Sequence, residues 1–108
     1  MKRGDVITVA LSGDYGKPRP AVVIQSDTLL ETESVLVCLI TSKRHEASIY
    51  RLDVPGSELT GLREPSQVMA DKIMAARRAK CGARVGRLDA ATIQALNQML
   101  AVVTGIAD

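Results

Sequence analysis

The chain divides its apolar residues into short, β-branched runs that are separated by Gly, Pro, Ser and Asp. Short runs of this kind between turn-forming residues indicate strands. Residues 66–74 fit either a strand or a helix, and we take them as a strand. Residues 12–16 (SGDYG) have the composition of a turn. The expected strands therefore span residues 4–11, 21–25, 34–42, 48–54 and 66–74, with Pro20 at the start of the second.

The last twenty residues follow a different period. Asp89 can cap a helix, and Gly105 can end it. Between them the apolar residues recur at helical spacing: Ile93, Leu96, Leu100 and Val103. Short strands followed by one C-terminal helix predict a mainly β fold with one helix, in which a small, strongly bent β-barrel carries the helix on its surface. Residues 27–33 read as a polar connection with room for one helical turn.

The length of 108 residues predicts a single domain, residues 1–108, with one modest core. The chain has no Trp and no Phe, so aliphatic side chains must fill that core. Chains of this size often bury additional surface by pairing with a second copy. We therefore expect self-association.

Positive charge is concentrated in one stretch, although the net charge is only +2. Residues 72–87 contain no acid, and such a cluster suits either a phosphate backbone or a solvated surface. The cations in this stretch are Lys72, Arg77, Arg78, Lys80, Arg84 and Arg87.

The sequence contains few residues that could bind a metal or a cofactor. Cys38 lies in an apolar run, where a free thiol behaves as a small hydrophobe, and Cys81 is distant from it in sequence. His45 is the one histidine, in a polar loop, and reads as an exposed residue rather than a catalytic base. We expect no cofactor and no metal site. No signal peptide or membrane span is recognisable, which favours a reducing cytoplasm.

A few polar side chains stand where they could act on a ligand. Arg19 lies between Pro18 and Pro20, so its backbone is stiff where a guanidinium could hold a phosphate. Thr41 and Ser42 end the most apolar run, and their hydroxyls could face a pocket or could simply cap a turn. Asp71 and Lys72 could form an ordinary surface ion pair.

Taken in order, the segments RGDVITVAL, KPRPAVVIQSD, VLVCLITS, SQVMADKIMAA and VGRLDAATIQALNQML resemble the MazF/PemK toxins of bacterial toxin–antitoxin modules. The resemblance extends from Lys2 to about Gly105. It implies an SH3-like β-barrel of the MazF/CcdB toxin type, assembled as a homodimer with RNA in a groove across the interface. It also implies an RNA-cleaving activity that a cognate antitoxin inhibits through a flexible, acidic C-terminal segment.

The family's functional positions carry over residue by residue. The catalytic positions fall on Arg19, Thr41 and Asp71. Met69 stands where some members have a second catalytic Arg, so a mechanism built on an Arg–Asp pair does not fit this chain. The side chains expected to bind the substrate are Lys17, Ser42, Lys43, Ser66, Lys72, Arg77 and Arg78.

The implied reaction needs no protein nucleophile, because RNA carries its own 2′-OH. The expected products are a 2′,3′-cyclic phosphate and a 5′-OH end. Two alternatives share the fold. A CcdB-like gyrase poison would use a C-terminal Trp-Gly-Ile, but residues 104–106 are Thr-Gly-Ile. A peptide-binding SH3-like module would line its groove with aromatic residues, and the chain has only Tyr15 and Tyr50.

Overall fold

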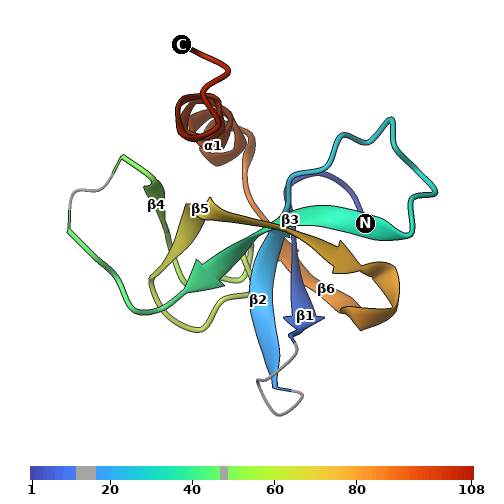
Figure 1. The fold of residues 1–108 in the computed structure, drawn as a ribbon. Coiled ribbons are helices and arrows are strands. Elements are labelled where there is room, and N and C mark those ends of the chain that lie inside the picture. Colours follow the sequence, from blue (N-terminus) through green and yellow to red (C-terminus); the bar gives the residue numbers. More distant parts are fainter. Residues whose placement is uncertain (12–16, 47–48) are drawn as a thin grey trace.

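The computed structural model describes residues 1–11, 17–46 and 49–108. The turn expected at residues 12–16 lies outside these ranges. The chain forms a bent sheet with a single helix, α1, against it (Figure 1). The elements are β1 Asp5–Ala10, β2 Pro18–Val23, β3 Ser34–Thr41, β4 Arg51–Val54, β5 Ser66–Arg77, a 3-10 turn at Arg78–Lys80, β6 Cys81–Arg87 and α1 Ala90–Val103.

All neighbouring strands pair antiparallel, in the order β4-β5-β3-β2-β1-β6. The mainly β fold with a C-terminal helix is confirmed. The closed barrel is not, because the edge strands β4 and β6 do not pair with each other in the described part of the chain. Strand β6 was missed from the sequence, and β5 is longer than expected. The segment 27–33 contains turns and bends but no helical turn.

The loop between β4 and β5, residues 55–65, lies across the gap between the two edges. The backbone N–H of Arg87 in β6 donates to the carbonyl of Leu59 in this loop at 2.8 Å. Gly86 makes the approach possible, since a Cβ there would lie 2.2 Å from the backbone of Thr60. The loop therefore connects β4 to β6 where sheet pairing does not.

Strands β1, β2 and β3 are buried on both faces of the sheet. One core, on the side of α1, contains Val6, Val22, Cys38 and Leu96 among others. The second core lies on the opposite side and is built from alternate residues of the same strands, including Ile7, Ala21, Val23 and Val37. Burial on both faces explains why β3 reads as a continuous apolar run rather than as an alternating one.

The prolines of β2 determine where this strand leaves β3. Residues 18–20 pair with β1 alone, whereas the ladder between β2 and β3 contains only residues 21–23. A proline has no N–H to donate to a neighbouring strand. The start of β2, residues 18–20, therefore separates from the end of β3, and this separation opens the sheet between Arg19 and Thr41.

Helix α1 follows the expected pattern. The Asp89 carboxylate accepts a hydrogen bond from the Thr92 backbone N–H at 2.8 Å. Hydrogen bonds from the side chain and then the backbone of Thr92 lower the pKa of Asp89. Leu96 is buried, and Ile93, Met99, Leu100 and Val103 pack on the same core. No helix in the described ranges is long and apolar enough to cross a membrane.

Candidate active site

A hollow of about 410 Å³ lies where the ends of β2 and β3 separate, a size typical of small-ligand sites (about 300–1,000 Å³). It brings together residues from β2, from the end of β3 and its following turn, and from the segment that leads into β5. The lining consists of Arg19, Pro20, Ile40, Thr41, Ser42, Lys43, Leu62, Arg63, Glu64 and Ser66. Half of these were predicted from the sequence as site residues: Arg19, Thr41, Ser42, Lys43 and Ser66.

Arg19 reaches the hollow from a stiff backbone. It pairs with Val9 of β1 and stands between Pro18 and Pro20, each with a fixed φ. Its side chain is exposed to solvent. A guanidinium held in this way presents several donors from a defined position, which suits a phosphate.

Thr41 ends β3, and its hydroxyl takes part in the turn that follows. The Lys43 backbone N–H donates to Thr41 Oγ1 at 3.1 Å. Because the oxygen accepts this bond, the Thr41 hydroxyl proton stays available to a ligand in the hollow. The capping role and the ligand-facing role considered for Thr41 are therefore compatible.

Ser66 is placed differently. Its side chain is only 4% exposed, and its Oγ donates to the backbone carbonyl of Glu64 at 2.9 Å. The hydroxyl proton of Ser66 is thus used within the protein. This geometry fits a residue that positions the segment 62–66 beside the hollow.

The segment before β5 adds lining residues that the sequence analysis missed: Leu62, Arg63 and Glu64. Residues 55–65 read only as a loop. The signal available was a pair of opposite charges held between Gly61 and Pro65, but nothing local indicates which neighbour such a loop meets.

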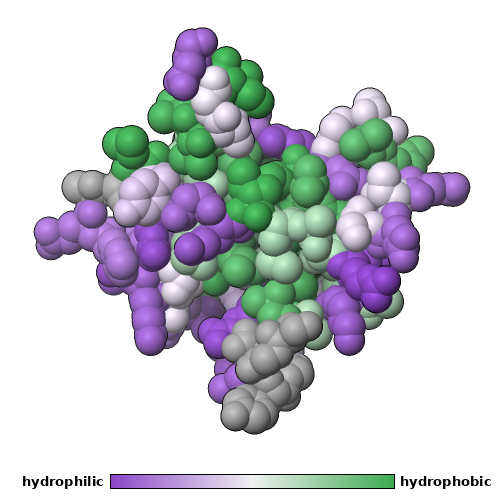
Figure 2. Space-filling model, in the orientation of Figure 1, coloured by the Kyte–Doolittle hydropathy of each residue, from purple (hydrophilic) through white to green (hydrophobic). Residues whose placement is uncertain are grey.

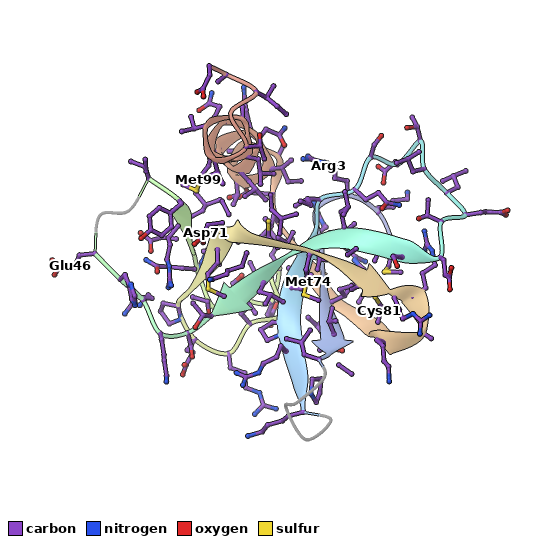
Figure 3. The ribbon with its side chains drawn as sticks, in the orientation of Figure 1. Arg3, Glu46, Asp71, Met74, Cys81 and Met99 are labelled. Carbon is purple, nitrogen blue, oxygen red and sulfur yellow. The ribbon has the colours of Figure 1, made fainter. Side chains whose placement is uncertain are left out.

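Asp71 and Lys72 do not line the hollow of their own chain. Both are exposed on an irregular stretch of β5, between the pairs Ile40–Val68 and Cys38–Ile73. Figure 3 shows Asp71 on the part of β5 near α1. Irregular pairing of this kind redirects side chains. Lys17, just before β2, is exposed and also outside the lining.

Arg77 and Arg78 lie at the far end of β5 and have partners there. Arg77 forms an exposed ion pair with Glu33 at 3.6 Å. Arg78 donates from Nε to the carbonyl of Thr32 and from Nη2 to that of Leu30 at 3.1 Å. The structure therefore separates these two predicted substrate-binding residues from the hollow and gives Arg78 a role in holding the loop before β3.

Arg84 and Arg87, from the same basic stretch, lie beside a different hollow. Arg84 pairs with the Asp5 carboxylate at 3.2 Å, beside a second hollow of about 520 Å³ formed by residues 1–5, 84, 87, 88 and 93. A cluster of charges in the sequence thus becomes several separate surfaces in the fold.

Cys38 and His45 behave as expected. The Cys38 thiol is fully buried, and burial raises its pKa to about 11, so it is neutral and unreactive at ordinary pH. His45 is exposed, and its backbone rather than its ring is bound, through Gln67. Among the described residues, no three His, Cys, Asp or Glu side chains are grouped as metal ligands would be.

The chain matches a known protein family over almost its whole length. Residues 2–104 match the family described as the PemK-like, MazF-like toxin of type II toxin-antitoxin systems. This chain belongs to that family. It is 38% identical over 108 residues to the probable endoribonuclease MazF of Mycolicibacterium smegmatis, with 99% of each chain covered.

Solved structures of PemK/MazF-like toxins share the fold. A mycobacterial endoribonuclease in complex with its cognate antitoxin superposes with a TM-score of 0.83 at 21% identity, over 98% of this chain and 96% of that one. The Mycobacterium tuberculosis toxin MazF-mt6 gives a TM-score of 0.81 at 20% identity, over 94% and 96%. MazF in a MazE-MazF structure from Deinococcus radiodurans gives 0.78 at 18%, over 97% and 95%.

Proposed function

We propose that this chain is an endoribonuclease toxin that cuts single-stranded RNA by attack of the substrate's own 2′-OH. The observation that carries the proposal is the hollow in which Arg19 from β2 meets Thr41 and Ser42 from the end of β3. The family, and a relative named as a probable endoribonuclease, support RNA as the substrate. The same match favours a nuclease over a gyrase poison or a peptide-binding module.

In the proposed step the 2′-oxygen forms a bond to phosphorus as the bond from phosphorus to the 5′-oxygen breaks. The 2′-OH loses its proton, and the departing 5′-oxygen gains one. The products are a 2′,3′-cyclic phosphate and a 5′-OH end, and no outside reactant is consumed. The nucleophile belongs to the substrate, so the protein's task is to orient the RNA and stabilise charge.

Arg19 is the proposed stabiliser of that charge. The phosphate gains negative charge as phosphorus becomes five-coordinate, and a guanidinium can donate two parallel hydrogen bonds to its oxygens. The flanking prolines hold the backbone of Arg19 in place before substrate binds. A donor placed in advance needs little reorganisation during the reaction.

Thr41 and Ser42 are proposed to donate further hydrogen bonds to the same phosphate. The bond from the Lys43 N–H to Thr41 Oγ1 leaves the Thr41 hydroxyl proton free to point into the hollow. Lys43 lines the hollow beside them and adds positive charge. Ser66 supports the opposite side by holding the carbonyl of Glu64.

The proposal includes a homodimer, and the dimer gives Asp71 a place in it. Leu36 and Ile73, on the adjoining strands β3 and β5, are 41% and 37% exposed. Figure 2 shows hydrophobic surface running from α1 across the middle of this face. A second copy packed there would cover these side chains and would lie next to Asp71. In the dimer, Asp71 would therefore lie at the interface, where the RNA groove is expected, and we assign it as the acceptor of the 2′-OH proton.

An antitoxin is the proposed regulator, as in the related complexes with a cognate antitoxin and with MazE. A flexible acidic segment would place carboxylates where RNA phosphates otherwise bind, at Arg19, Lys43 and Arg63. RNA and the antitoxin segment should therefore compete for the hollow.

The test is cleavage of a single-stranded RNA in EDTA, with analysis of the new ends. We expect cutting to continue in the chelator, to leave cyclic phosphates, and to stop when deoxyribose replaces the ribose at the cut site. Loss of activity in EDTA that Mg²⁺ restores would refute the metal-independent mechanism. Cutting of the deoxyribose substrate would refute attack by the 2′-OH.

A further inference from the structure

We propose that Glu64 selects the RNA sequence, by binding the Watson–Crick edge of a guanine next to the phosphate that is cut. The inference rests on the proposed nuclease activity and adds to it a residue that determines specificity.

The hollow has two chemically different sides. The ends of β2 and β3 supply a guanidinium, an ammonium and hydroxyls, which suit a phosphate. The segment before β5 supplies Leu62, Arg63 and Glu64. Glu64 is the single acidic residue of the lining, and its carboxylate can only accept hydrogen bonds. A phosphate would repel it, whereas the N–H groups of a base would not.

The backbone of Glu64 is held while its side chain is exposed. Ser66 Oγ donates to the Glu64 carbonyl at 2.9 Å. Gly56 packs so closely on this residue that a Cβ there would lie 2.7 Å from the Glu64 nitrogen. In the described part of the chain, the Glu64 carboxylate has no hydrogen bond or ion pair. A fixed backbone with an uncommitted carboxylate is suited to binding an incoming donor.

The geometry of the bases points to guanine. Its Watson–Crick edge carries N1–H and the N2 amino group side by side, which match the two oxygens of a carboxylate. Adenine and cytosine offer one amino group, and uracil offers one imino group. Unpaired RNA leaves these edges accessible, and single strands are recognised in this way. Leu62 adds apolar surface beside Glu64, against which a base can pack.

The experiment is cleavage of a random-sequence RNA pool, followed by sequencing of the 5′-OH ends. The wild-type protein should require guanine at one position near the cut. Glu64→Gln should lower the preference for guanine there by roughly 5- to 150-fold, the usual range for one paired contact, and leave the other positions unchanged. Glu58→Gln is the matched control: Glu58 is exposed on the same loop but outside this hollow, and its motif should equal the wild type.

A second measurement does not depend on the activity of the variant. Inosine lacks the N2 amino group, so replacing the guanine by inosine in a non-cleavable RNA should weaken binding to the wild type. The same replacement should have no effect on binding to Glu64→Ala, because that variant has no side-chain acceptor left for the amino group.

Several results would overturn the inference. They are a wild-type motif without guanine, a Glu64→Gln motif identical to the wild type, and an equal loss of rate on every sequence, which would indicate a role in the chemical step. If the wild type cuts no RNA, the nuclease proposal fails and the inference fails with it. Cleavage with an unaltered motif refutes only the role of Glu64.

Discussion

Two groups of cations that look alike in the sequence have different surroundings in the fold. Arg19, Lys43 and Arg63 come from separate segments and line one hollow together with hydroxyl groups. Arg77 and Arg78 are consecutive, and they face a carboxylate and backbone carbonyls of the loop before β3. The scattered set is the one that we propose binds the RNA.

The difference shows that charge density along a chain is a poor guide to a binding site. A guanidinium whose donors are taken by carbonyls has little left for a phosphate, whatever its neighbours in sequence. The useful question is where each donor points once the strands have paired. This comparison can be tested by asking which cations affect activity and which affect stability.

The largest effect is expected from Arg19→Ala. Removing one donor to the developing charge should lower RNA cleavage by about 10²- to 10³-fold, and the unfolding midpoint should stay near that of the wild type. Arg19→Lys should recover little, because an ammonium cannot donate in the same paired geometry. Single-turnover cleavage of one RNA, with a thermal melt of each variant, measures both. A rate near that of the wild type for Arg19→Ala would make the loop merely structural.

Arg78→Ala should lower the stability of the protein and leave its cleavage activity nearly unchanged. It leaves the carbonyls of Leu30 and Thr32 without their donor, and we expect a loss of about 1–3 kcal/mol in the free energy of unfolding. Cleavage per folded molecule should change little. Arg77→Ala is the control, since its pair with Glu33 is largely exposed and should be worth under about 1 kcal/mol. A stable Arg78→Ala protein with weak RNA binding would reverse the comparison.

The salt dependence of RNA binding gives a smaller but sharper difference. Each lost phosphate contact should reduce the slope of log K against log salt by about 0.7 for a single strand. We expect this reduction for Lys43→Gln and for Arg63→Gln. Lys80 is exposed near Arg78, away from the hollow, so Lys80→Gln should leave the slope unchanged. Titration of a non-cleavable RNA at several salt concentrations provides the slopes, and equal slopes for all three variants would contradict the distinction.

The smallest effect is expected from His45→Ala. The backbone N–H of His45 donates to Gln67 Oε1 at 3.0 Å, and its carbonyl accepts from Gln67 Nε2 at 2.8 Å. Both bonds survive the substitution, because neither uses the imidazole. Cleavage should stay within about twofold of the wild type at any pH that folds the protein. A large loss would show that the imidazole itself takes part in the reaction.

Much of the fold was predictable because its signals are local. The apolar run at residues 34–42 and the cap at Asp89 appear where expected, since strand burial and helix capping depend on neighbours in sequence. Strand β6 was missed because its residues are mostly exposed and rich in Gly and Arg. What makes it a strand is pairing with β1, from Asp5–Arg87 to Val9–Cys81, which no local pattern reveals.

The site was predictable in part because the family resemblance pointed to Arg19 and Thr41. Arg19 and Thr41 end two strands that are neighbours in the sheet, so their meeting follows from the topology. Arg63 and Glu64 belong to a loop that folds back on itself, with its own Gly56 packed closely against the backbone of Glu64. Asp71 was expected as a third catalytic residue, but it lies on an irregularly paired stretch of β5, outside the hollow of its own chain.

The loop 55–65 links recognition to folding in a way that limits how such a protein can evolve. The same backbone closes the gap between β4 and β6 and holds Glu64 beside the hollow. Insertions or deletions there would disturb the sheet edges along with the substrate. Substitution of the exposed side chains at 63 and 64 would leave unchanged both the backbone contact of the loop with β6 and the packing of Gly56 on residue 64. New specificities should therefore arise within this lineage by point substitution at position 64, while the length of the loop stays constant.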